Sequence, residues 1–306
     1  MVYEDILKAN GNTPLIKLNK MVSDDMADVY VKYEGVNIGG SIKTRAALGM
    51  IEDAERTGKL KKGMCIVETT SGNQGIALAM VGAVKGYKVI IVMPDSVSEE
   101  RRRLIKQYGA KIRLVHDEND IGACIKKCYQ IVENTQREDE NVFVPSQFSN
   151  PANVIAQKQV GIEIVHDLGK VDGFCSGFGT GGTITGIASV LKENNPDTYV
   201  VAIEPEKAAV LSGKKISSHL QMGIGDGVIP PILDQSLIDE IVLVSDEEAI
   251  KVAKELALKE GIIAGISSGT NVSVALKLAK KLGKGKVVVT ILPDTGERYY
   301  STPLFD

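Results

Sequence analysis

The sequence contains no tryptophan, and aromatic residues make up only 5% of its 306 residues. So few aromatics disfavour a base-stacking platform for nucleic acid and an aromatic belt for a membrane. Long apolar runs are also missing: the most apolar short stretch, Val89–Met93, is far below the roughly 18 residues of a membrane span. Basic and acidic residues nearly balance at 36 and 39, so the charge predicts neither a nucleic-acid partner nor a disordered acidic tail.

Cysteine and histidine are scarce, with 4 and 3 residues, and neither type shows a metal-binding spacing. Because no CxxC pair is present, we expect reduced thiols and no metal ion. The N-terminus lacks the basic start and the apolar run of a signal peptide, which predicts a cytoplasmic protein. The cysteines are Cys65, Cys124, Cys128 and Cys175.

Short apolar runs of strand character alternate with helical runs along most of the chain. Continuous β-branched runs separated by helices are typical of mostly parallel sheets flanked by helices, so the predicted class is α/β. The length suggests about two domains, and polar stretches at 137–141 and 149–153 are candidate boundaries. The expected strands are 65–67, 88–93, 111–115, 171–175, 199–203 and 286–292. The expected helices include 75–81, 99–108, 121–133, 246–259 and 270–282, and one that opens after the glycines near 180 and runs to about 194.

A glycine-rich segment, Gly177–Gly186, follows a predicted strand and opens a predicted helix. Glycines let backbone N–H groups approach an anion, and the unpaired N–H groups and dipole of a helix start favour negative charge there. Gly177, Gly179 and Gly182 also match the GxGxxG dinucleotide fingerprint, a short pattern that recurs by chance. A phosphate site, a dinucleotide site and a purely structural turn all remain open on these residues alone.

Two further segments carry candidate chemistry. The polar cluster Thr69–Gly75 lies at a predicted helix start, where Ser71 or Asn73 is expected to act as a cap. Its amide, hydroxyl and free N–H groups together suit a bound carboxylate. Lys43 lies in a tight loop of small residues; most lysines are solvated surface charges, but one in such a loop can lose its proton and form a Schiff base.

Taken in order, these motifs make the chain resemble the cysteine synthase (O-acetylserine sulfhydrylase) family of fold-type II pyridoxal-phosphate enzymes, which includes the cystathionine β-synthase core. The resemblance implies a homodimer whose subunits have two domains, as in the β subunit of tryptophan synthase. Residues 1–41 and 151–306 would form the larger domain, and residues 42–150 the smaller, mobile one. The resemblance to the family covers essentially the whole chain. It is carried by the motifs Asn12–Leu15, Asn37–Lys43, Thr70–Asn73, Gln147–Asn153, Gly179–Thr183, Gly265–Gly269 and Gly296–Tyr299.

The resemblance also implies roles for individual residues. Lys43 would hold pyridoxal 5'-phosphate covalently, Asn73 would bond the ring hydroxyl, and Ser267 would face the pyridine nitrogen. The cofactor phosphate would rest on Gly179, Thr180, Gly181, Gly182 and Thr183. The substrate carboxylate would be bound by Thr70, Ser71, Gly72 and Gln147.

The implied reaction is β-replacement or β-elimination on a 3-substituted L-alanine through an aminoacrylate intermediate. Lys43 would remove the Cα proton and later return one. A neutral serine at the ring nitrogen makes a weaker electron sink than an aspartate, which suits rapid loss of a β-substituent. The substrates would be small amino acids, with no nucleic-acid or membrane partner.

Ile38, Thr44, Gln74 and Asp226 depart from the family pattern, and the last two bear on the reaction. Gln74 replaces a small hydroxyl residue, a change that alters the space for a β-substituent. Asp226 stands where a small apolar residue is usual; it is either a tight-turn residue or a general base that activates water.

Several reactions therefore stay open. Within the pyridoxal-phosphate class, cysteine synthesis from O-acetylserine and sulfide competes with conversion of L-cysteine to L-serine and hydrogen sulfide, in which Asp226 would activate water. Remoter alternatives are a serine or threonine dehydratase, an NAD-dependent dehydrogenase built on Gly177–Gly182, and a non-catalytic binding relative. The sequence leaves undecided which donor and nucleophile are preferred.

Overall fold

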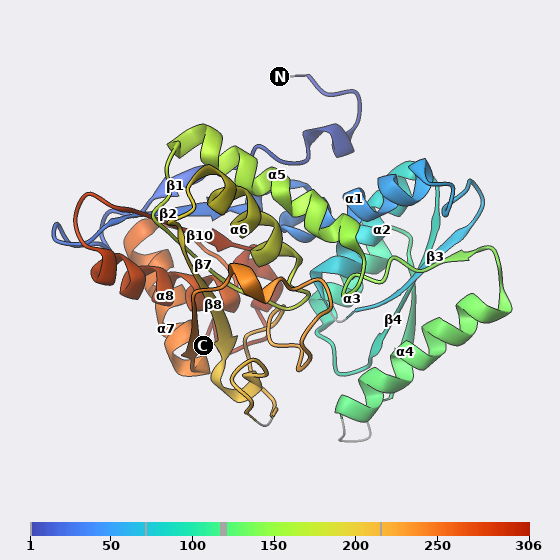
Figure 1. Ribbon diagram of the computed structural model, residues 1–306. Coiled ribbons are helices and arrows are strands. Elements are labelled where there is room, and N and C mark those ends of the chain that lie inside the picture. The colour runs from blue at the N-terminus through green and yellow to red at the C-terminus, as the bar shows by residue number, and fades with distance from the viewer. Residues whose placement is uncertain (1, 71, 117–120, 215) are drawn as a thin grey trace.

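The computed structural model describes residues 2–70, 72–116, 121–214 and 216–306, and it contains two sheets (Figure 1). In the larger sheet every pairing is parallel except that of the edge strand β1 with β2. Its order is β1 (Leu15–Lys17), β2 (Asp28–Tyr33), β10 (Val287–Leu292), β7 (Gly173–Gly177), β8 (Tyr199–Pro205) and β9 (Glu240–Val244). The smaller sheet is entirely parallel, in the order β5 (Lys111–Val115), β4 (Lys88–Pro94), β3 (Cys65–Thr69) and β6 (Val142–Phe143).

Helices cover both faces of each sheet, and a separate apolar core fills each layer. On the larger sheet, α5 (Pro151–Leu168) and α6 (Gly182–Asn194) pack on one face, and α7 (Asp246–Glu260) and α8 (Ile266–Leu282) on the other. The helices of the smaller sheet are α1 (Lys43–Arg56), α2 (Asn73–Lys85), α3 (Glu99–Gln107) and α4 (Ile121–Glu138). The short 3-10 helices are η1 (Ile6–Ala9), η2 (Glu34–Val36), η3 (Ile38–Gly40), η4 (Glu206–Ala208), η5 (Gln235–Leu237) and η6 (Gly296–Tyr299).

The predicted α/β class is confirmed, because buried β-branched strands alternate with covering helices in both halves. Each sheet lies within one of the two predicted domains, while the domain boundaries themselves remain a prediction. Among the described residues, no helix is both long and apolar enough to cross a membrane.

Several local predictions were wrong in their boundaries. Helix α8 begins at Ile266 rather than at 270, because Gly265 in extended conformation acts as its N-cap. Lys43 does not lie in a loop but is the first residue of α1. Asn73 does not cap α2 through its side chain, since the N-cap is Gly72 and Asn73 is the first helical residue. Ser71 lies outside the described residues.

The stretch at 149–153, predicted only as a boundary, is a helix start. The Asn150 side chain accepts a hydrogen bond from the Ala152 N–H, and Pro151 occupies the first turn of α5. Asparagine at the N-cap followed by proline is a common helix-start signature. This helix start brings Asn153, which follows β6, against Thr180 in the turn after β7.

Candidate active site

The glycine segment forms the turn between β7 and α6. Gly181 is the N-cap of α6 with φ of +80°, and no side chain caps this helix start. A Cβ on Gly182 would lie 2.5 Å from the Asn153 Oδ1, so this position needs glycine for the loop to close on its neighbour. The turn therefore presents free N–H groups and the positive end of the α6 dipole, which together suit a phosphate.

Lys43 is placed near this turn by the end of strand β10. The Ile42 N–H donates to the Pro293 carbonyl oxygen at 2.9 Å, and Ser41 pairs with Asp294 in an isolated β-bridge. Burial lowers the pKa of Lys43, while the negative charges of Asp226 and Asp294 act in the opposite direction. Among the described residues, the amine has no hydrogen-bond partner, so it is available as a nucleophile or base.

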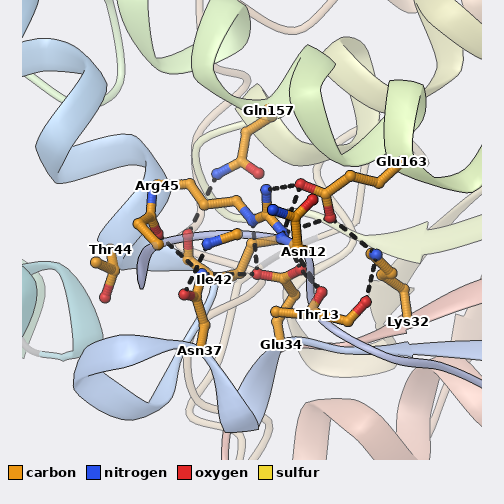
Figure 2. A network of polar contacts seen from close by, with 12 residues as sticks. Asn12, Thr13, Lys32, Glu34, Asn37, Ile42, Thr44, Arg45, Gln157 and Glu163 are labelled. Atoms are coloured by element: carbon orange, nitrogen blue, oxygen red, sulfur yellow. Dashed lines mark hydrogen bonds and ion pairs between the residues drawn. The ribbon is translucent and has the colours of Figure 1, made fainter. Parts of the chain in front are cut away.

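Behind Lys43, a buried ionic network fixes the first turn of α1 (Figure 2). Arg45 donates to Glu34 at 2.8 and 2.9 Å and to Glu163 at 2.7 and 2.8 Å, in a bidentate arrangement on each side. Glu163 also pairs with Lys32 at 2.8 Å. The network joins β2, α1 and α5, so the helix that begins with Lys43 is held against both of its neighbours.

This network shifts the pKa values of Glu163 and Arg45. Burial alone would raise the pKa of Glu163, but hydrogen bonds and charges from Arg45 and Lys32 lower it to about 2. The pKa of Arg45 is raised, because its carboxylate partners outweigh the effect of burial. Glu163 and Arg45 therefore remain ionised at neutral pH and keep their ion pair, which makes the network a rigid support.

The segment after β10 carries a second polar cluster. The Asp294 Oδ2 accepts hydrogen bonds from the Asn73 Nδ2 at 2.6 Å and from the Tyr299 hydroxyl at 2.7 Å. Arg298 donates to the Asn73 Oδ1 and to the Gly39 carbonyl oxygen. The Asn73 amide is thus held through both its nitrogen and its oxygen. The Asp294 Oδ1 is buried without a partner in the described structure.

Ser267 lies in the first turn of α8, close to the same cluster. Its neighbour Gly265 packs so closely on Asp294 and Tyr299 that a side chain at Gly265 would overlap them. Ser267 is buried and has no hydrogen-bond partner among the described residues. The hydroxyls of Ser268 and Ser41 are likewise buried without partners there.

Asp226 reaches the phosphate-type turn from the loop after β8. A Cβ on Gly179 would lie 2.5 Å from its Oδ2, so the carboxylate touches the glycine backbone. The side chain of Asp226 is partly exposed to solvent. Burial of its carboxyl group by the surrounding protein raises its pKa, and the charge of Lys43 opposes this rise. Among the described residues it accepts no hydrogen bond, which argues against the tight-turn interpretation.

The loop that carries Asp226 is fixed by His219. The His219 Nδ1 accepts from the Gln221 N–H at 3.1 Å, and its Nε2 lies 3.0 Å from the Gly225 carbonyl oxygen. Because a carbonyl only accepts, the proton of this imidazole is on Nε2. Gly225 in turn donates to the Phe178 carbonyl oxygen at 3.0 Å, which ties the loop to the glycine turn.

The predicted carboxylate-binding residues lie where β3 and β6 end. The Thr70 Oγ1 accepts from the Gly72 N–H at 3.2 Å, just before α2. Gln147 is buried, with its side chain unpaired among the described residues and its carbonyl oxygen bonded to the Asn153 Nδ2 at 2.9 Å. Asn153 also donates to the Thr180 Oγ1 at 3.2 Å, which links this region to the glycine turn.

Comparison with known proteins gives the family. Residues 6–294 match the family described as "Pyridoxal-phosphate dependent enzyme". The chain belongs to this family. A cysteine synthase of Staphylococcus aureus is 47% identical over 305 residues, covering 99% of this chain and 97% of that protein.

Solved structures of other family members superpose on nearly the whole chain. A hydrogen sulfide-producing enzyme from Fusobacterium nucleatum has a TM-score of 0.91 at 40% identity, covering 97% of this chain and 100% of that chain. A cysteine synthase from Entamoeba histolytica has a TM-score of 0.94 at 37% identity, covering 100% of this chain and 91% of that chain. The protein is therefore a pyridoxal-phosphate-dependent enzyme of cysteine metabolism with the fold of these enzymes.

The cleft of this family member has the donor set that pyridoxal 5'-phosphate requires. It combines an amine of lowered pKa, a glycine turn with free N–H groups, and buried hydroxyl and carboxylate oxygens that lack partners in the described chain. One phosphate at the turn explains the glycines without a dinucleotide, and the family assignment argues against the NAD-dependent alternative.

Sequence reasoning did not identify Arg45, Asp294, Arg298 and Asn153 as site residues. Asn153 and Arg298 lie inside motifs that carried the resemblance, and Arg45 lies two residues after Lys43. Their partners lie far away in the sequence, so only the folded chain shows them. Gln74, noted as a departure, is buried with both polar atoms of its amide unpaired in the described structure.

Proposed function

We propose that the enzyme performs β-replacement and β-elimination on 3-substituted L-alanines, with O-acetylserine or L-cysteine as donor and sulfide as nucleophile or leaving group. The proposal is supported by relatives named cysteine synthase and hydrogen sulfide-producing enzyme. The observation that carries it is the amine of Lys43, whose pKa burial lowers, beside both a phosphate-type turn and a helix start suited to a carboxylate.

Different residues of the site bind the substrate and the cofactor. Thr70, Gly72 and Gln147, together with the first N–H groups of α2, bind and orient the substrate carboxylate. Residues 179–183 hold the cofactor phosphate, and Lys43 anchors the cofactor before substrate arrives. When bound, pyridoxal 5'-phosphate supplies the electron sink for chemistry at Cα and Cβ.

Proton movement is assigned to Lys43. Once substrate has displaced it, the amine removes the Cα proton and later returns a proton to the same carbon. Its lowered pKa keeps more of the amine in the neutral form that accepts a proton. Ser267 and Asn73 orient the cofactor ring, with Ser267 leaving its nitrogen uncharged.

A second candidate reaction rests on Asp226. In it L-cysteine and water give L-serine and hydrogen sulfide, and the Asp226 carboxylate accepts the proton of the attacking water. The free carboxylate on Gly179, without a hydrogen bond in the described chain, favours this reaction. A base must be ionised, so this activity rises as the pH increases through the raised pKa of Asp226.

Product analysis tests both reactions. Purified enzyme loaded with cofactor is incubated with L-cysteine alone, and separately with O-acetylserine and sulfide. The proposal predicts sulfide release in the first reaction or cysteine and acetate in the second; neither product from an enzyme that binds the cofactor contradicts it. For the second candidate, Asp226→Asn must lose serine formation, and unchanged serine formation refutes the role of Asp226.

Assembly and location complete the proposal. We infer a cytoplasmic homodimer that meets only small-molecule substrates, because the curated relatives are bacterial cysteine synthases. Light scattering on the purified protein tests the dimer, since a single subunit has a mass of 32.8 kDa.

A further inference from the structure

Glu68 is a buried carboxylate at the end of β3, immediately before the segment proposed to bind the substrate carboxylate. Only 3% of the residue is exposed. Its Oε1 accepts from the Thr69 N–H at 3.0 Å, and its Oε2 accepts from the Gln147 N–H at 3.3 Å. One carboxylate therefore joins the two chain segments that carry the proposed carboxylate-binding residues.

The second segment needs such a support. Ser146 has a φ of +54°, a left-handed conformation that is unfavourable for a residue with a side chain. On its other side, the Gln147 carbonyl oxygen accepts from Asn153, which also donates to Thr180 in the glycine turn. The bonded chain runs from Glu68 through Gln147 and Asn153 to the proposed phosphate site.

Among the described residues, no cation pairs with this carboxylate. Burial raises the pKa of Glu68 to about 7, although hydrogen bonds from the backbone of Gln147, Thr69 and Ser146 act against the rise. The neighbouring groups add no positive charge: Ile91 is its register partner on β4, and α2 begins with Asn73 and Gln74.

Helix α4 faces Glu68 with Tyr129 and Cys128, both of which have raised pKa values. Burial is the main cause for Tyr129, and the charges of Glu68 and of Asp226 add to it. For Cys128, burial comes first and Cys124 adds to it, while Thr69 opposes the rise to about 11. Both groups are neutral near pH 7, so Glu68 is the group on these elements whose charge changes there.

We propose that Glu68 is a positioning residue that clamps Thr69, at the end of β3, to Gln147, and that its ionised form sets the geometry in which the substrate carboxylate is bound. This inference rests on the proposed function of the cleft. An ionised carboxylate accepts both N–H groups in charge-assisted hydrogen bonds. A protonated carboxyl group presents an O–H to one of them and loosens that side of the clamp.

The clamp and the stability of the fold depend on pH in opposite ways. The folded-state pKa of Glu68 lies above the usual value of 4.5, so its contribution to stability is greatest below 4.5 and is lost as the pH rises towards 7. Substrate binding by the ionised form improves over the upper part of the same range. A purely structural carboxylate has no reason to combine these two trends.

The test compares Glu68→Gln with Glu204→Gln. Glu204 is a matched control, because it is 1% exposed at the end of β8 and also accepts backbone N–H groups, from Leu211 at 2.8 Å and from Ser212 at 3.2 Å. Sulfide release from L-cysteine, and cysteine formation from O-acetylserine, are followed between pH 6 and pH 9 with the cofactor-loaded enzymes.

For Glu68→Gln we expect the KM of the amino-acid donor to rise about tenfold, as for loss of one charge-assisted hydrogen bond, with a much smaller change in kcat. For cysteine formation from O-acetylserine, the inflection of kcat/KM near pH 7 disappears in Glu68→Gln, and Glu204→Gln keeps the wild-type profile. The melting temperature of Glu68→Gln, relative to wild type, rises from pH 5.5 to pH 8. A KM and an inflection that both match wild type overturn the proposal.

Amide hydrogen exchange separates this proposal from the proposed function. If the cofactor-loaded wild type turns over neither substrate pair, the proposed function fails while the clamp is still measurable. We expect peptides containing Thr69 and Gln147 to exchange faster in Glu68→Gln than in wild type above pH 7. Equal exchange rates in these peptides overturn the clamp whatever the activity shows.

Discussion

Replacing Arg45 with methionine is expected to destabilise the protein severely. The substitution keeps an unbranched apolar stem but removes the guanidinium group and its hydrogen bonds to Glu34 and Glu163. Glu34 is left fully buried with only the neutral donors Thr13 and Asn37, while Glu163 keeps Lys32. Breaking a buried ion pair by removing one partner typically costs about 3–5 kcal/mol.

The cost translates into a measurable shift of the unfolding transition. For a chain of this size, about 3–5 kcal/mol corresponds to a melting temperature lower by roughly 6 to 15 °C. The matched control is Arg103→Met, which breaks an exposed pair of 2.7 Å with Glu99 on α3 and is expected to cost about 0.5 kcal/mol or less. Urea unfolding followed by circular dichroism at pH 7 measures the loss in free energy of unfolding for Arg45→Met and for Arg103→Met.

The pH dependence tests the reasoning more closely than the loss itself. Without Arg45, Glu163 becomes protonated at a higher pH. As the pH falls, protonation of Glu163 therefore removes part of the buried negative charge of the variant. The stability gap between Arg45→Met and wild type should therefore narrow between pH 7 and pH 4. A gap below about 1 kcal/mol at pH 7, or one that widens on acidification, refutes the electrostatic account of the network.

Two further predictions concern the same supports. Glu163 has a folded-state pKa of about 2 against the usual 4.5. Its contribution to the free energy of unfolding, up to about 3 kcal/mol, is therefore present above pH 4.5 and is lost as the pH falls towards 2. In urea titrations, wild type should lose more stability than Glu163→Gln over that range. Gly181→Ala should weaken cofactor binding at least tenfold in equilibrium dialysis, because its φ is +80° and its Cβ would lie 2.8 Å from the Leu233 Cβ. Gly63→Ala has a φ of +94° and nothing within 4 Å, so it should show the backbone strain alone and normal cofactor affinity.

The sequence predicts the parts of the site that consist of local patterns. The glycine turn and the polar helix start can be recognised from residue types at fixed spacing after strands. Helix α6 begins in the predicted glycine segment and ends at Asn194, as predicted. Helix ends set by glycine are harder: α8 begins four residues before its predicted start, because its first turn consists of Ile266, Ser267, Ser268 and Gly269 rather than strong helix formers.

The supports behind the site could not be predicted, because they depend on pairs distant in the sequence. Arg45 and Glu163 are 118 residues apart, and Glu68 and Gln147 are 79 apart. A single sequence shows many arginines and glutamates but not which of them the fold buries together. The same limit applies to Asp226, whose contact with Gly179 depends on how the loop at 223–227 folds over the turn.

The central claim is that the amine of Lys43 carries the cofactor. The most direct measurement is reduction of the cofactor-loaded enzyme with borohydride, followed by proteolysis and mass spectrometry of the peptides. The account predicts one pyridoxyl group on the peptide that contains Lys43, and none when Lys43→Ala is treated in the same way. A modified lysine elsewhere, or no modified lysine in an enzyme that turns over substrate, contradicts it.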